Sequence, residues 1–96
     1  MQTFRMNGAG NAFVIVDTRA DAGRLDADAV RALASGRLGR PADQVIAMER
    51  SPSGGLFMRI WNRDGSEAAA CGNATRCVAW LAMQESGEEE VVVETV

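Results

Sequence analysis

The sequence contains no histidine, no lysine and no tyrosine, and all ten of its basic residues are arginine. Without histidine, the chain cannot itself form a Ser–His or Cys–His nucleophile pair, or a zinc site of the common Cys/His type. Without lysine, it has neither a P-loop nor a Schiff-base attachment for pyridoxal phosphate. Acid–base chemistry on this chain would therefore depend on carboxylates and on two thiols. A thiol is the group whose pKa is most readily brought near 7.

Length and charge exclude further classes of protein. The 96 residues suffice for one small domain, and 47% of them are hydrophobic, which is typical of a globular core. The net charge is only -3 and the arginines are scattered, so we expect no nucleic-acid partner. There is no apolar run long enough to cross a bilayer and no signal-peptide pattern in residues 1–10, so we expect no membrane partner. Two cysteines without a disulfide framework indicate a reducing, cytoplasmic setting.

Hydrophobic periodicity and turn residues predict a mixture of strands and helices. A turn with two glycines, residues 7–11, should follow the first strand, and Asp64-Gly65 should form another turn. Asp26 is expected to cap the start of the first helix and Gly36 to end it. Asn73 and Gly87 are expected to do the same for the second helix. The expected strands are Gln2–Met6, Phe13–Asp17, Gln44–Met48, Leu56–Trp61 and Val91–Val96, and the expected helices are Leu25–Gly36 and Asn73 to about Glu85.

The second predicted helix has an unusual centre. Residues Cys77–Met83 are seven consecutive apolar residues. Because a helix that is apolar on every side must be surrounded by protein, we expect the strands to wrap around it. The chain stops inside its last predicted strand, so we also expect a fold that is incomplete at the C-terminus.

The segment Cys71-Gly72-Asn73 at the start of this helix is the best candidate for chemistry. Partial positive charge at a helix N-terminus favours a thiolate, and the free N–H groups there can hold a carboxylate. A small buried apolar side chain is the alternative role for Cys71, and it is the expected one for Cys77 inside the helix. Six residues of helix separate the two thiols by about 9 Å, beyond the roughly 7 Å limit between Cα atoms of a disulfide, so we expect no bridge.

Three segments together resemble the diaminopimelate epimerase family, in its N-terminal half. They are Gly8-x-Gly10-Asn11-x-Phe13, Asn62-x-Asp64-Gly65-Ser66-Glu67 and Cys71-Gly72-Asn73-x-x-Arg76-Cys77. The resemblance implies an α+β fold of two similar lobes, each a mixed, largely antiparallel sheet curled around a central apolar helix. It implies an isomerase that interconverts LL- and meso-diaminopimelate, in lysine and peptidoglycan synthesis, without pyridoxal phosphate, metal or other cofactor. Residues 1–96 would then be the N-terminal catalytic lobe.

The same resemblance implies roles for six residues. Cys71 would be the acid/base cysteine of this lobe, and the N–H groups of Gly72 and Asn73 would hold the substrate α-carboxylate. The polar substrate-binding residues would be Asn11, Gln44 and Asn62, although local sequence alone makes Asn11 a turn residue and Gln44 an exposed strand start. The implied partners are diaminopimelate and a C-terminal lobe with a second cysteine, and a homodimer is left open.

Three positions depart from the usual family pattern: Asn7 stands in place of a common His, Ala12 in place of a common Asp, and Ala74 in place of a common Gly. Two other functions therefore stay open. One is a related proline-type racemase or epimerase, whose motif usually differs around the cysteine. The other is a non-catalytic domain of the same fold that binds a carboxylate at the helix N-terminus without turnover.

Overall fold

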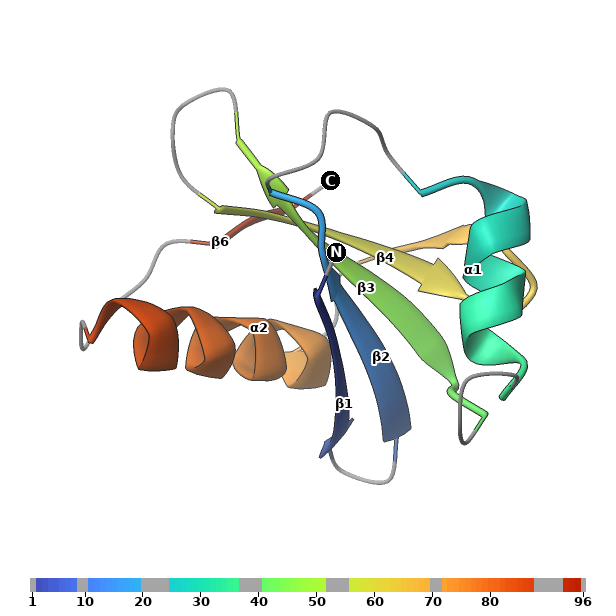
Figure 1. The fold of residues 1–96 in the computed structure, drawn as a ribbon, viewed down its shortest axis with the longest axis horizontal. Coiled ribbons are helices and arrows are strands. Elements are labelled where there is room, and N and C mark those ends of the chain that lie inside the picture. Colours follow the sequence, from blue (N-terminus) through green and yellow to red (C-terminus); the bar gives the residue numbers. More distant parts are fainter. Residues whose placement is uncertain are drawn as a thin grey trace.

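The fold of this computed structural model is a sheet with one helix on each face (Figure 1). The structure describes residues 2–8, 11–19, 25–36, 41–51, 56–69, 72–87 and 93–95. The elements are the strands β1 (Gln2–Gly8), β2 (Asn11–Asp17), β3 (Gln44–Arg50), β4 (Leu56–Asn62), β5 (Glu67–Ala68) and β6 (Val93–Thr95), and the helices α1 (Ala27–Ala34) and α2 (Gly72–Ser86).

The sheet is mixed and largely antiparallel, as predicted. Its strands lie in the order β1-β2-β3-β4-β5, and β6 pairs with the first residues of β4. The pairs β1–β2, β3–β4 and β4–β5 are antiparallel, whereas β2–β3 and β4–β6 are parallel. Parallel neighbours need a crossover connection, and α1 lies in the connection from β2 to β3.

Alternate residues of the central strands enter two separate cores, one on each face of the sheet. The α2 face buries Phe13, Ile15 and Ile46 among others, together with Ala74, Cys77, Val78 and Ala82 of the helix. The α1 face buries Val14, Val16, Val45, Ala47 and Trp61 with Val30 and Ala34. Both faces of β2 are covered, which explains why this strand is a continuous apolar run in the sequence.

The capping prediction for α1 is confirmed. Asp26 is the N-cap, and its carboxylate accepts a hydrogen bond of 2.8 Å from the backbone N–H of Ala29. The helix ends at Ala34, and Gly36 follows it with φ of +89°. Its outer side is exposed and its inner side packs on β3, so α1 is amphipathic in the ordinary way.

Several predicted boundaries need correction. The glycine turn is shorter than residues 7–11, because Asn7 pairs with Ala12 and Gly8 with Asn11 in the β1–β2 ladder. Helix α2 begins at Gly72, so Asn73 lies within its first turn and is not the N-cap. The strand β5 was not predicted, since two residues carry no periodicity. The last strand is described only at Val93–Thr95, and Val91, Val92 and Val96 lie outside the described residues.

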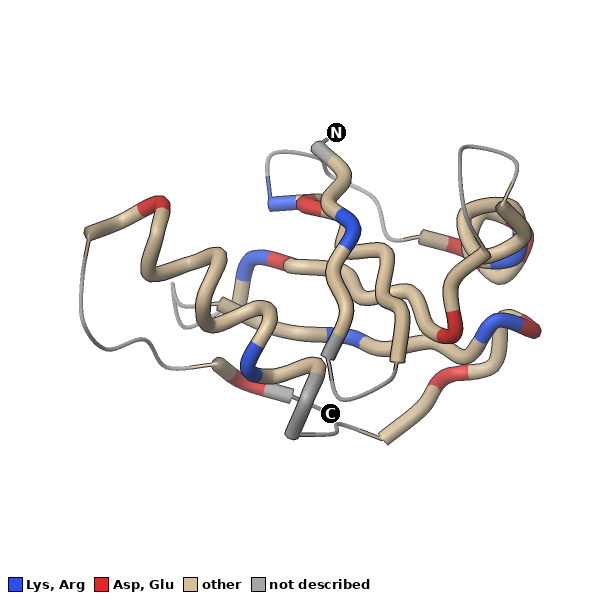
Figure 2. The backbone as a smooth tube through the Cα atoms, turned by 90° about the horizontal axis from the view of Figure 1, so that it is seen from below, with Lys and Arg blue, Asp and Glu red and all other residues tan. Residues whose placement is uncertain are grey.

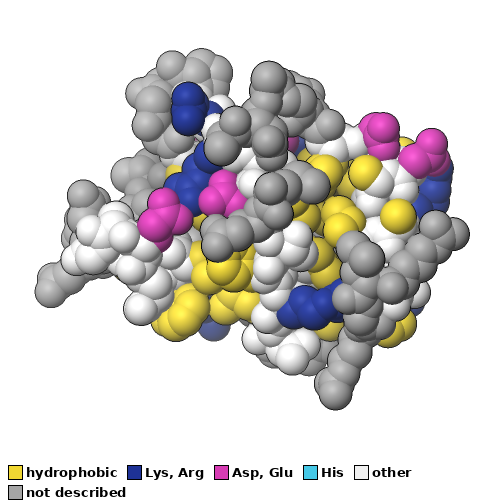
Figure 3. All heavy atoms as spheres, in the orientation of Figure 1, with side chains coloured by type: hydrophobic (Ala, Val, Ile, Leu, Met, Phe, Trp, Pro, Cys, Tyr) yellow, Lys and Arg dark blue, Asp and Glu magenta, His cyan; other side chains and the backbone are white. Residues whose placement is uncertain are grey.

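Helix α2 is covered by the sheet on one side. Ala74, Cys77, Val78 and Ala82 are buried, whereas Trp80 is 51% exposed. Hydrophobic side chains are visible on the surface on the side of the molecule where α2 lies (Figure 3, lower left). None of the helices in the described part of the chain is long and apolar enough to cross a membrane.

Candidate active site

Three residues with amide side chains lie at one edge of the sheet. Asn11 begins β2, Gln44 begins β3 and Asn62 ends β4. Because β2 and β3 are parallel and β4 is antiparallel to them, these three strand ends lie at the same edge. Gln44 pairs with Phe13 on one side and with Asn62 on the other. The sheet thus brings together residues 11, 44 and 62, which are far apart in the sequence.

The three amides also belong to the same face of the sheet. Asn11 lies two residues before Phe13, and Gln44 and Asn62 each lie two residues from the core residues Ile46 and Ile60. Since side chains alternate along a strand, all three belong to the face that carries α2. Each of the three is partly exposed, so this edge combines an apolar floor with accessible polar groups.

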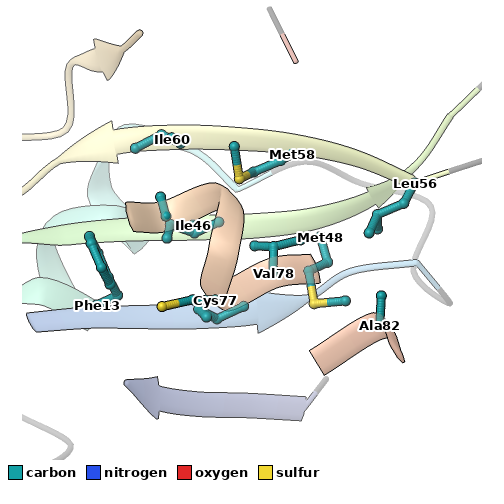
Figure 4. Close-up of a cluster of buried hydrophobic side chains, with 11 residues drawn as sticks. Phe13, Ile46, Met48, Leu56, Met58, Ile60, Cys77, Val78 and Ala82 are labelled. Carbon is teal, nitrogen blue, oxygen red and sulfur yellow. The ribbon is translucent and has the colours of Figure 1, made fainter. Parts of the chain in front are cut away.

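The N-terminal half of α2 lies toward this edge. Cys77 lies beside Phe13, near the start of β2, whereas Ala82 lies toward Met48 and Leu56 at the opposite edge (Figure 4). The helix begins with Gly72, so its first turn, with the backbone N–H groups of Gly72 and Asn73, is on the same side as the amides. Unpaired N–H groups and the helix dipole favour an anion at such an end.

A chain of hydrogen bonds holds the carboxamide of Asn62. Its Oδ1 accepts from Gln44 Nε2 at 3.4 Å, and its Nδ2 donates to Ser66 Oγ at 3.2 Å. Ser66 Oγ in turn donates to Asp64 Oδ1 at 2.6 Å. This bond and that of the Ser66 backbone N–H lower the pKa of the Asp64 carboxyl below its usual value. The Asn62–Ser66 turn therefore fixes the amide toward Gln44.

Backbone bonds close the same turn. The Asn62 N–H donates to the Ser66 carbonyl at 2.8 Å, and the Gly65 N–H donates to the Asn62 carbonyl at 3.0 Å. Helix α1 supports the turn from outside, because Arg31 Nη1 donates to the Asp64 carbonyl at 3.3 Å. Asp64-Gly65 was predicted as a turn from its sequence, and this prediction is confirmed.

The two cysteines differ in what the structure describes. Cys77 is buried, 7% exposed, in the core between α2 and the sheet, as expected for a structural residue. Cys71 lies outside the described residues, as do the side chain of Asn73 and the glycine-turn residues Ala9 and Gly10. Gly72, the residue that follows Cys71, is the first residue of α2.

Sequence reasoning missed two residues at this edge. Ser66 holds Asn62, and Asp43, just before Gln44, accepts a hydrogen bond from the Ala12 N–H at 2.8 Å. Ser66 belonged to the quoted segment Asn62–Glu67 but was given no role, and a polar residue before a strand is so common that Asp43 did not stand out. The described part of the chain contains no cluster of three His, Cys, Asp or Glu side chains able to hold a metal ion.

A pocket of about 300 Å³ lies elsewhere, between the last residues of β2 and the C-terminal half of α2. Phe4 and Leu81 line it beside the ion pair of Asp17 and Arg19. Its acidic and basic groups are already paired with each other, and it is at the opposite edge of the sheet from the amides. The amide edge is therefore the better candidate for a site.

Comparison with known proteins shows the family of this chain. The model of the diaminopimelate epimerase family matches residues 3–96. This chain belongs to the diaminopimelate epimerase family. The diaminopimelate epimerases of Phenylobacterium zucineum and Rhodospirillum centenum are 48% and 52% identical to it over 95% of its length. The chain spans about a third of these relatives, covering 33% and 32% of their lengths.

A solved structure shows the same fold. The phenazine biosynthesis protein of the PhzF family from Bacillus anthracis superposes with a TM-score of 0.56 and 24% sequence identity, over 96% of this chain and 30% of that one. At this identity the likeness concerns the fold alone. The predicted α+β class with a mixed, largely antiparallel sheet is thereby confirmed for this member of the diaminopimelate epimerase family.

Proposed function

We propose that this chain is the N-terminal lobe of an enzyme that interconverts LL- and meso-diaminopimelate in lysine biosynthesis. The observation that supports it best is the meeting of Asn11, Gln44 and Asn62 at the sheet edge toward which the start of α2 is directed. The match to the diaminopimelate epimerase model favours this substrate over one of the proline type.

In this proposal the α-carboxylate binds at the start of α2. The N–H groups of Gly72 and Asn73 hold its oxygens, and the helix dipole adds to the attraction. Asn11, Gln44 and Asn62 bind the polar groups around the reacting carbon. Charge that develops on the carboxylate during proton removal is stabilised by donors that are already oriented, so little reorganisation is needed.

Cys71 is the acid/base group of this lobe. As a thiolate it removes the α-proton, the C–H electron pair passes to the carbon and its carboxylate, and Cys71 becomes a thiol. A second thiol on the opposite face gives its proton to the same carbon and becomes a thiolate, so the stereocentre is inverted and no atom is gained or lost. Cys77 cannot be this second thiol, because it belongs to α2 itself and is buried between this helix and the sheet.

The second cysteine must therefore come from outside residues 1–96. We propose a C-terminal lobe that closes over the substrate, excludes water and strengthens the contacts to the carboxylate. The sequence places no other thiol in this chain. No cofactor or metal is required by this mechanism, and a cytoplasmic location is consistent with reduced thiols.

The test joins residues 1–96 to the C-terminal two-thirds of the Phenylobacterium zucineum relative, which is 48% identical to this chain where they align. We expect the fusion to epimerise both the LL and the meso isomer. The 96-residue chain alone and the relative's part alone should epimerise neither isomer. Chiral analysis of the product gives the readout. A folded but inactive fusion that still binds diaminopimelate would favour the non-catalytic binding domain, and turnover by the 96-residue chain alone would contradict the two-lobe proposal.

A further inference from the structure

We propose that Asp43 is a positioning residue that sets the distance between the amides of Asn11 and Gln44; this inference rests on the proposed function. Asp43 and Ala12 are joined by two hydrogen bonds. Asp43 Oδ2 accepts from the Ala12 N–H at 2.8 Å, and the Asp43 N–H donates to the Ala12 carbonyl at 2.8 Å. Residue 12 directly follows Asn11 and residue 43 directly precedes Gln44, so each bonded residue is next to one of the amides.

The place of these bonds explains why a side chain is needed there. The paired register of β2 with β3 begins at Phe13 and Gln44. Ala12 and Asp43 therefore lie just beyond the end of this pairing. Strand ends open more readily than strand centres. A carboxylate acceptor makes a stronger hydrogen bond than a neutral one, and here it binds the last backbone N–H before the amide edge.

Asn11 is then held from two directions. It pairs with Gly8 of β1 on one side, and the next residue, Ala12, is fixed to the start of β3 on the other. Gln44 follows Asp43 and hydrogen-bonds Asn62. Asp43 therefore connects the strand that carries Asn11 to the pair formed by Gln44 and Asn62. Its Oδ2 is used on the backbone, so in this proposal Asp43 acts on the substrate through these neighbours.

The first experiment compares Asp43→Ala, Asp43→Asn and the control Asp17→Ala in the fusion enzyme. Asp17 is a matched control, because its carboxylate also accepts a backbone N–H, from Arg19 at 3.1 Å, and it lies at the other end of β2. We expect Asp43→Ala to lower kcat/KM about tenfold, the effect of one lost charge-assisted hydrogen bond. Asp43→Asn keeps an acceptor oxygen and should retain most of the activity that Asp43→Ala loses. The control Asp17→Ala should lower stability while kcat/KM stays within twofold of wild type.

The second experiment is independent of activity and uses nuclear magnetic resonance on the 96-residue chain. We expect Asp43→Ala to shift the side-chain amide resonances of Asn11 and Gln44 and to speed hydrogen exchange of the Ala12 N–H, whereas Asp17→Ala leaves all three unchanged. Unshifted amides in Asp43→Ala would overturn the inference, as would an Asp43→Ala fusion that matches Asp17→Ala in kcat/KM. If the wild-type fusion is inactive, the proposed function fails, and the resonances of Asn11 and Gln44 still decide the role of Asp43.

Discussion

Asp17 at the end of β2 forms a partly buried ion pair with Arg19. Arg19 donates to it through Nε at 2.9 Å and Nη2 at 2.8 Å, and Nη2 also contacts Glu85 of α2 at 2.6 Å. The hydrogen bond from the Arg19 side chain is the main cause that lowers the pKa of Asp17 below its ordinary value of 3.8. The network connects the end of β2 to the C-terminal half of α2.

We expect Asp17→Asn to lower the free energy of unfolding by about 1 kcal/mol at pH 7, since the pair is partly exposed. Because the folded state favours ionised Asp17, this contribution is complete above the ordinary pKa of 3.8 and is lost as the pH falls through the lower folded-state pKa. Urea unfolding of both proteins at pH 7 and near pH 2.5 measures it. The difference should shrink at the lower pH, and an undiminished difference there would contradict this assignment.

At the scale of elements, the Asn62–Ser66 turn is the part of the site that the structure defines best. Gly65 has φ of +94°, and a Cβ added there would lie 3.0 Å from the Cβ of Ala27 and 3.1 Å from Arg31 Nη1. Both contacts come from α1, so the turn is confined by the helix as well as by its own backbone. A side chain at position 65 is therefore strained by the backbone and presses on α1, and any displacement of the turn would carry Asn62 with it.

We expect Gly65→Ala to cost about 2 kcal/mol of stability, from the left-handed backbone and the contact with α1 together. Gly87→Ala is the matched control, because Gly87 has φ of +74° but an added Cβ there meets nothing within 4 Å. It should cost less and leave the Asn62 amide resonance in place. Thermal unfolding and amide spectra of the two variants test this, and equal effects would mean that α1 does not confine the turn.

The sequence predicted a helix or strand correctly where a hydrophobic or capping pattern extended over several helical turns or strand positions. Phe13–Asp17 and the helix from Asp26 are examples, because burial or capping imposes the pattern directly. The short strand β5 and the exact start of α2 depend on tertiary pairing and on backbone geometry over one or two residues, so no local pattern revealed them. The bond between Gln44 and Asn62 depends on strand order, which local sequence does not contain.

The roles of Asn11, Gln44 and Asn62 came from the family resemblance, whereas the local pattern had already singled out Cys71-Gly72-Asn73 at a helix start. Local sequence predicted that Asn11 is a turn residue. In the structure it is the first residue of β2, which pairs with β3, the strand that begins with Gln44. Asp43 was missed because a carboxylate before a strand resembles an ordinary turn residue, and its partner Ala12 is 31 residues away. Sequence could therefore name the amides but not the residues that hold them.

For the molecule as a whole, the charged residues do not gather into one field. Among the described residues, arginine and acidic positions are interspersed along the backbone (Figure 2). The described ion pairs are formed by single arginines with one or two carboxylates, such as Arg59 with Glu49 and Glu67.

The second whole-molecule feature is the uncovered side of α2. Trp80 is 51% exposed, although the helix around it is rich in apolar residues. An exposed apolar surface of this kind promotes association. We expect the 96-residue chain to self-associate or bind a hydrophobic dye, and Trp80→Lys to reduce both without loss of the folded sheet. Size-exclusion chromatography with dye fluorescence tests this, and a monomer that binds no dye would contradict it.

The central claim is that Cys71 is the acid/base group of this lobe and that Cys77 is structural. The most direct measurement is deuterium wash-in at the α-carbon of LL- and meso-diaminopimelate, with Cys71→Ala and Cys77→Ala compared in the fusion enzyme. We predict that Cys71→Ala abolishes epimerisation in both directions, while Cys77→Ala keeps it and loses about 1 kcal/mol of stability from a small buried truncation. Near-normal inversion by Cys71→Ala, with deuterium at the inverted carbon, would contradict the account.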